Sequence, residues 1–230
     1  MAHLTQSGGT GRGQLGVLGE VGWLSQQPPD FQAVVARLGR WREFRPKEII
    51  YLAGSAPDGL YGLAAGTLEI SFPLVGEEQV TVHRAEPGFW IGEAAILASQ
   101  DRFITLTAAT PVKVLFVSRI ELRRLIEADP RHWGAFYEQS VGNQIITLTL
   151  LAEVLSLTPR ARVARLLLRL ADAEGVVTGN QEDLARLLGM TRSSIRRVIT
   201  NLAESKLIAT GYSSLRILDH GGLEGLVREA

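Results

Sequence analysis

Three arginines lie close together in the stretch "TRSSIRRVIT" of residues 191–200. A guanidinium group is planar and permanently charged, and it can pair with two phosphate oxygens or with two atoms on the edge of a guanine. At helical spacing, one side of such a helix would carry only polar side chains. The candidate nucleic-acid contacts are Arg192, Ser193, Arg196, Arg197 and Thr200, together with Thr191, which directly precedes them.

The twenty residues that begin at Gln181 have the spacing of a helix-turn-helix. Ala185 is fifth, where a small side chain lets a second helix cross close to the first. Gly189 is ninth, where the turn requires a left-handed backbone that a side chain would resist. Ile195 and Val198 are fifteenth and eighteenth, where branched apolar side chains hold the second helix against the first. Gly189 is therefore expected to be the corner between two helices.

The second helix of this motif is expected to span about residues 192–205, with Thr191 as its N-cap. After it, "KLIATGYSSLRILD" predicts two short strands around a Gly-Tyr-Ser-Ser turn. A helix-turn-helix followed by such a hairpin is a winged helix. We predict a winged helix-turn-helix domain over residues 159–230, beginning with a helix at Pro159.

The distribution of charge along the chain supports this prediction. The formal net charge is zero, but residues 1–158 carry 13 Lys and Arg against 16 Asp and Glu. Residues 159–220 carry 10 against 6, and all but one of these ten cations are Arg. An arginine-rich C-terminal part indicates a surface that faces a polyanion.

Composition excludes several other classes of protein. The chain has no cysteine, which excludes disulfides, thiolate zinc sites and cysteine-ligated iron–sulfur clusters. Its four histidines are scattered, so no metal site is expected. The sequence has no phosphate-binding lysine loop, nucleophile elbow or HExxH motif, and we do not expect an enzyme. No apolar run approaches the ~20 residues of a membrane span, and no signal-peptide core is present. We expect a cytoplasmic protein without a membrane partner.

The N-terminal half shows a different pattern. Residues 1–21 are expected to be a flexible tail, and a short helix is predicted over about residues 28–38. Short pieces rich in β-branched and aromatic residues then follow, separated by Gly, Pro and Asp. Within them, Gly59, Gly62 and Gly66 are candidates for positive φ. We predict an α+β protein whose residues 22–130 form an antiparallel β-roll domain.

From Trp133 to about Leu157 the apolar residues recur at helical spacing. Two interpretations remain open, namely packing against the chain's own β-domain and a parallel coiled-coil seam with a second copy. We predict a dimerisation helix over residues 131–158. Its expected interface consists of Val141, Gln144, Leu148, Leu151 and Leu155.

The order of these parts resembles the Crp-Fnr family of bacterial transcription regulators. The resemblance covers about residues 22–219 and is carried by "YLAGSAPDGLYGLAAGTLEI", "PGFWIGEAAIL", "RVARLLLRLA" and the helix-turn-helix. It implies a homodimer that binds palindromic double-stranded DNA, with RNA polymerase as a further expected partner. An effector in the β-roll would set the geometry of the two DNA-reading helices.

The resemblance also implies where an effector would bind. Gly92 and Glu93 match the residues that meet the ribose and phosphate in cyclic-nucleotide-binding members, and Arg102 matches the phosphate-binding arginine. Phe103 stands where those members have a hydroxyl residue, and Thr147 stands where a family hydroxyl meets the adenine. Cyclic AMP and cyclic GMP are the candidate ligands. The open alternative is a degenerate roll in which Glu93 caps a turn and Arg102 is a surface charge.

The same resemblance bears on the DNA sequence. Many members have an acidic residue after the first recognition arginine, whereas this chain has Ser193. A serine is a weaker acceptor for cytosine than a glutamate, so we expect a half-site different from the usual TGTGA-like sequence. Two alternatives remain: a nucleotide-binding signalling module that acts through protein contacts, and a regulator that needs no effector.

Overall fold

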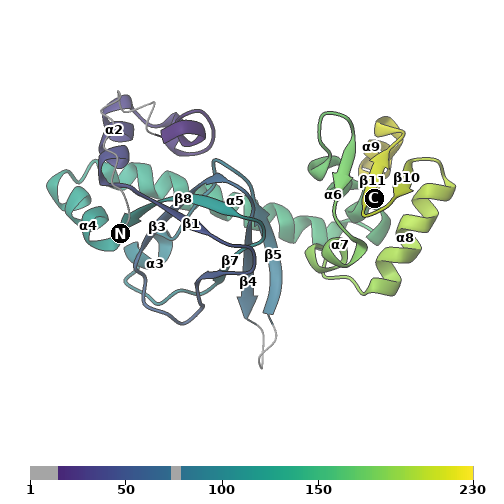
Figure 1. The fold of residues 1–230 in the computed structure, drawn as a ribbon, viewed down its shortest axis with the longest axis horizontal. Coiled ribbons are helices and arrows are strands. Elements are labelled where there is room, and N and C mark those ends of the chain that lie inside the picture. Colours follow the sequence, from purple (N-terminus) through teal and green to yellow (C-terminus); the bar gives the residue numbers. More distant parts are fainter. Residues whose placement is uncertain (1–14, 74–78, 230) are drawn as a thin grey trace. The chain divides into compact units, whose positions relative to one another are not determined.

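The computed structural model describes residues 15–73 and 79–229, and the chain forms two compact units, residues 1–144 and 145–230 (Figure 1). The first unit combines antiparallel sheets with helices, and the second is mostly helical. The predicted α+β class is therefore confirmed. The long helix α5 (His132–Ser156) begins in the first unit and ends in the second. The finer division at residues 22–130, 131–158 and 159–230 stays a prediction.

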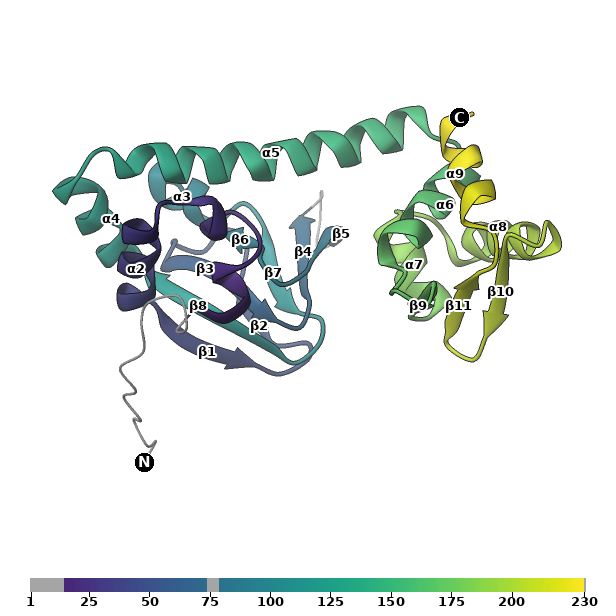
Figure 2. The ribbon, with the colours of Figure 1, turned by 90° about the horizontal axis from the view of Figure 1, so that it is seen from above.

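Two four-stranded antiparallel sheets make up the β-roll of the first unit (Figure 2). Their strand orders are β1-β8-β3-β6 and β2-β7-β4-β5. A core that includes Tyr61, Leu63, Leu106 and Val114 lies between them, because alternate side chains of each strand point inward. The strands are β1 (Arg40–Phe44), β2 (Ile49–Tyr51), β3 (Gly59–Ala65), β4 (Leu68–Pro73), β5 (Gln79–Ala85), β6 (Trp90–Ile91), β7 (Thr105–Ala108) and β8 (Val112–Ser118).

A second core lies where helices pack on the β-roll, and it includes Leu18, Trp90, Leu122 and Phe136. Phe136 comes from the first half of α5, so this half of the helix packs within its own unit. Helix α4 begins with a capping box between Ser118 and Glu121. The helical elements are η1 (Gly16–Gly19), η2 (Leu24–Gln26), α2 (Pro29–Leu38), α3 (Glu93–Leu97) and α4 (Arg119–Ala128).

The expected flexible tail is wrong in its last part. Leu15 and Leu18 are fully buried in the helix-packed core, and η1 begins at Gly16. Apolar side chains that fill a core lose their solvent exposure, which favours an ordered backbone. Residues 1–14 lie outside the described residues.

The expectation of positive φ at the three glycines of the roll holds only for Gly66, whose φ is +83°. Gly59 and Gly62 lie inside β3, and a Cβ there would come within 2.2 Å of the Phe116 ring and 2.5 Å of the Trp90 ring. These two positions need glycine because aromatic rings approach the backbone closely.

The second unit is a helical domain with a three-stranded antiparallel sheet of order β10-β11-β9. Its core includes Val163, Leu167, Ile195, Leu202 and Leu223. Within the described residues, none of the helices is long and apolar enough to cross a membrane. The elements that follow α5 are α6 (Pro159–Leu170), β9 (Val176–Thr178), α7 (Gln181–Leu187), α8 (Arg192–Glu204), β10 (Ile208–Gly211), β11 (Ser214–Ile217) and α9 (His220–Arg228).

Candidate functional site

The predicted corner of the helix-turn-helix is present. Gly189 has a φ of +59°, and the backbone N–H of Met190 donates to the carbonyl of Ala185 at 2.9 Å. Ala185 and Ile195 are buried between α7 and α8. The hydroxyl of Thr191 accepts from the backbone N–H of Ser194 at 3.2 Å, as expected of an N-cap. The prediction of a winged helix-turn-helix is confirmed, with β10 and β11 as the wing.

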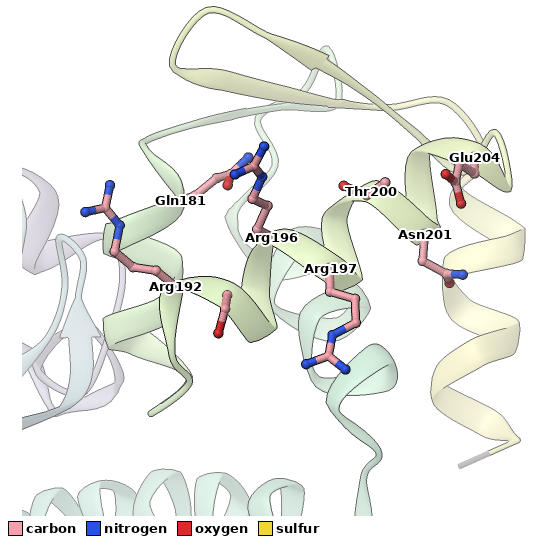
Figure 3. A pocket seen from close by; sticks show the side chains of 8 residues that line it. Gln181, Arg192, Arg196, Arg197, Thr200, Asn201 and Glu204 are labelled. Carbon is pink, nitrogen blue, oxygen red and sulfur yellow. The ribbon is translucent and has the colours of Figure 1, made fainter.

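All six predicted nucleic-acid contacts are exposed. Five of them, from Arg192 to Thr200, line an open groove of about 970 Å³ along α8. Figure 3 shows the three arginine side chains spread along this helix, with Arg196 and Arg197 extending in different directions. The groove is lined by Gln181, Arg192, Ser193, Arg196, Arg197, Thr200, Asn201 and Glu204.

The electrostatics of this face leave its arginines accessible. Arg192 forms an exposed ion pair with Glu182, whose Oε2 lies 3.8 Å from Arg192 Nη1. Within the part of the chain that the structure describes, Arg196 and Arg197 form no ion pair. Arg192 is also the first residue of α8, where the unpaired backbone N–H groups of a helix favour an anion.

Three residues of the groove were not predicted from the sequence: Gln181, Asn201 and Glu204. Asn201 lies four residues after Arg197, so helical spacing could have identified it. Tyr212 was also missed, although it is fully exposed at the tip of the wing between β10 and β11. The Gly-Tyr-Ser-Ser turn could have identified it, since the tip of a hairpin is commonly exposed.

In the first unit, Glu93 is buried under the first half of α5. Its Oε2 accepts from Gln139 at 2.8 Å, and its Oε1 accepts from Ser140 at 3.1 Å and from Asn143 at 3.2 Å. Burial raises the pKa of the Glu93 carboxyl above its ordinary value, while these hydrogen bonds act in the opposite direction. The three donors lie 46 to 50 residues after Glu93 in the sequence, and no sequence pattern indicated that they would contact it.

Arg102 is also buried, which contradicts the alternative of a surface charge. Its guanidinium donates to the carboxylate of Asp58 at 2.8 Å and to the carbonyls of Gly59 at 2.6 Å and Gly92 at 3.2 Å. It also lies over the Tyr51 ring, 4.0 Å from the centroid.

Gly92 brings its carbonyl close to this guanidinium. Its φ is +118°, and a Cβ there would come within 2.7 Å of Arg102 Nη1. A side chain at this position would therefore collide with the arginine. The structure brings Gly92, Glu93 and Arg102 together around the start of α3.

Asp58 is the residue of this cluster that the sequence did not indicate. Its Oδ2 accepts from the Tyr61 hydroxyl at 2.6 Å, while its Oδ1 accepts from Arg102. Burial, followed by the hydrogen bond to Asp58, raises the pKa of Tyr61 well above its ordinary value. Asp58 and Arg102 are 44 residues apart, so no local pattern links them.

The remaining candidate effector residues are Phe103 and Thr147. Phe103 follows Arg102 in sequence, but its side chain is 55% exposed. Thr147 is exposed on α5 within the second unit. Their roles in effector binding stay predictions. Within the described residues, no group of three or more His, Cys, Asp or Glu could hold a metal ion.

The predicted dimer face follows α5. Leu148, Leu151 and Leu155 belong to the second unit and are 62%, 52% and 77% exposed. Gln144 is exposed and Val141 is half-buried in the first unit. Large apolar side chains left in water at seven-residue spacing are typical of a helix that pairs with another.

Comparisons with known proteins agree with this architecture. Residues 41–129 match the model of the cyclic nucleotide-binding domain, and residues 161–226 match that of the Crp-like helix-turn-helix domain. The HTH-type transcriptional regulator Cmr of Mycobacterium tuberculosis is 29% identical over 188 residues, which are 79% of this chain and 74% of that protein. The transcriptional regulator LdrP of Thermus thermophilus is 29% identical over 192 residues, which are 80% of this chain and 94% of that protein.

The solved structures show the same relationship. A crystal structure of a CRP-family transcriptional regulator from Thermus thermophilus has a TM-score of 0.68 and 27% identity, and the match covers 82% of this chain and 97% of that one. The fold, the two matched domains in this order and these relatives agree with one another. The chain belongs to the Crp-Fnr family of transcription regulators.

Proposed function

We propose that the protein is a homodimeric, sequence-specific DNA-binding regulator that reads the major groove with the exposed face of α8. The observation that carries the proposal is the groove along α8, which is lined by three exposed arginines. Arginine at the N-terminal part of a recognition helix can reach guanine edges, and the following residues can reach phosphates. Tyr212 at the wing tip is positioned to touch the adjoining DNA backbone.

The dimer part of the proposal is supported by α5. Leu148, Leu151 and Leu155 would bury their exposed apolar surface against the same residues of a second copy. Two copies related by a twofold axis would present two α8 helices to successive major grooves, roughly 34 Å apart. The expected operator is therefore a palindrome with half-sites about one helical turn apart.

The β-roll is proposed as the sensing domain, and the family resemblance makes cyclic AMP and cyclic GMP the first ligands to test. One observation favours a second candidate, a regulator that binds DNA without any cyclic nucleotide. Glu93 and Arg102 already have hydrogen-bonding partners from the chain itself. Each of these two buried groups therefore has polar partners within the folded roll when no nucleotide is bound.

The test is selection of binding sites from random duplex DNA with the purified full-length protein and no added nucleotide. We expect enrichment of an inverted repeat whose half-site differs from TGTGA. Leu148→Glu with Leu155→Glu should produce monomers in analytical ultracentrifugation and should weaken binding to the selected repeat. Enrichment of no sequence, or of a single non-repeated half-site by a protein that sediments as a monomer, would contradict the proposal.

A further inference from the structure

Arg102 already uses three of its five N–H groups, and its Nε–H is buried without a partner within the described residues. Its Nη2 donates one hydrogen to Asp58 and the other to the Gly59 carbonyl, while Nη1 donates to the Gly92 carbonyl. A guanidinium pairs with a phosphate through two parallel hydrogen bonds, and both of its bidentate edges include an Nη2 hydrogen. A phosphate could pair in this way only if one of the two existing Nη2 bonds were broken.

Asp58 is itself held in place from several sides. Its Oδ2 accepts from Tyr61, and Arg42 lies 3.8 Å from the same oxygen. Its backbone carbonyl accepts from the N–H of Arg119 at 2.7 Å. The Asp58 side chain is 48% exposed, whereas the side chain of Arg102 is 2% exposed. The carboxylate therefore stands between the buried guanidinium and water.

We propose that Asp58 is the specificity-determining residue of the β-roll, because its carboxylate takes the position on Arg102 that the phosphate of a cyclic nucleotide would occupy. This inference rests on the proposal that the roll is the sensing domain, and it names ligands that the wild-type roll rejects. A carboxylate tethered next to its partner competes at a high effective concentration. It also repels an incoming phosphate of the same charge.

The test is titration calorimetry of the full-length protein with cyclic AMP and with cyclic GMP. We expect weak binding or none by the wild type. Asp58→Ala removes the competing carboxylate and should bind at least one of the two nucleotides at least tenfold more tightly. Asp58→Asn keeps the volume and one of the two acceptor oxygens but loses the charge, so it should give a smaller gain. It also serves as the second variant if Asp58→Ala does not fold.

Two controls separate this mechanism from a general effect of charge. Asp101→Asn removes the charge of an exposed carboxylate next to Arg102 in sequence and should bind like the wild type. Arg102→Gln added to Asp58→Ala should abolish the gain, because the new binding requires the guanidinium. Thermal melts followed by circular dichroism show which variants are folded.

Several outcomes would overturn the inference. One is a wild type that binds either nucleotide within twofold of the Asp58→Ala affinity. Others are no gain in any folded Asp58 variant, an equal gain in Asp101→Asn, or a gain that survives the loss of Arg102. The calorimetry contains no DNA, so it tests the role of Asp58 independently of DNA binding. A negative calorimetry result would not contradict the proposed DNA-binding function, and a negative site selection would not contradict the role of Asp58.

Discussion

The β-roll and the recognition helix use charged residues in opposite ways. In the roll, Glu93 and Arg102 are buried, and the chain itself supplies their hydrogen-bonding partners. On α8, Arg196 and Arg197 are exposed at an open groove. A buried charge must be partnered when the chain folds, since its desolvation would otherwise cost several kcal/mol. An exposed charge carries no such cost and stays available for an external anion.

This difference separates residues that hold the fold from residues that bind a partner. Loss of a buried charge should reduce the free energy of unfolding, whereas loss of an exposed arginine should reduce affinity for DNA and leave stability almost unchanged. Stability and DNA affinity can be measured separately, so each side of this contrast can be tested by itself.

The largest effect is expected for Arg196→Ala combined with Arg197→Ala. Each arginine should contribute about 1–3 kcal/mol to DNA binding, so the double variant should lose at least roughly 30-fold in affinity. The slope of log K against log salt should become shallower by about one for each phosphate that the variant no longer binds. Fluorescence anisotropy on the selected operator at several salt concentrations measures both quantities. An unchanged affinity, or a melting temperature lowered by several degrees, would contradict the view that these exposed arginines bind DNA without stabilising the fold.

The next effect is on stability. Arg102→Gln would leave the carbonyls of Gly59 and Gly92 without their donor and remove the ion pair with Asp58. Because Asp58 is half-exposed and can be solvated, we expect a loss of about 2–3 kcal/mol in the free energy of unfolding. Denaturant titration measures this loss, with Arg197→Ala as the exposed control. Equal stabilities of the two variants would show that burial does not distinguish these arginines.

A smaller, pH-dependent effect is expected at Glu93. Burial raises the pKa of Glu93, so the folded chain retains a proton that the unfolded chain releases. The stability of the wild type should therefore fall, relative to that of Glu93→Gln, as the pH rises from 4.5 through the folded pKa. Denaturant titrations of both proteins from pH 4.5 upward measure the difference. A difference that is constant across this range would argue against an ionisable, buried Glu93.

The smallest effect is expected at Glu182, whose exposed carboxylate lies 3.8 Å from Arg192. Exposed ion pairs are worth only a few tenths of a kcal/mol, so Glu182→Gln should leave stability unchanged. It should strengthen DNA binding by roughly twofold, because it frees Arg192 and removes a negative charge near the phosphates. Glu174→Gln, at an exposed position elsewhere in the same unit, is the control. Weaker binding by Glu182→Gln would assign Glu182 a direct contact with DNA.

The two regions also differed in how far they could be predicted. The helix-turn-helix was predicted down to the left-handed Gly189 and the cap at Thr191, since both depend on residues within one turn of helix. The roll was predicted only as a series of short strands, and β6 shows why their pairing could not be predicted. β6 is only two residues long, and it pairs with β3 at Tyr61 and Gly62, about thirty residues away in the sequence. Such pairing leaves no periodic signal in the short strand.

The features that could be predicted from the sequence alone depend on interactions between residues close together in the chain. The 3.6-residue period places the polar side of α8 outward, a glycine permits the corner, and a seven-residue spacing puts leucines along one side of α5. The carboxylate that pairs with Arg102 and the side chains that surround Glu93 could be identified only from the folded chain. Those partners come from 44 to 50 residues away, and they meet because sheet pairing and helix packing bring distant segments together. The free energy of a buried charge in the folded chain depends on these neighbours. The free energy of an exposed charge on a helix depends mainly on its solvation by water.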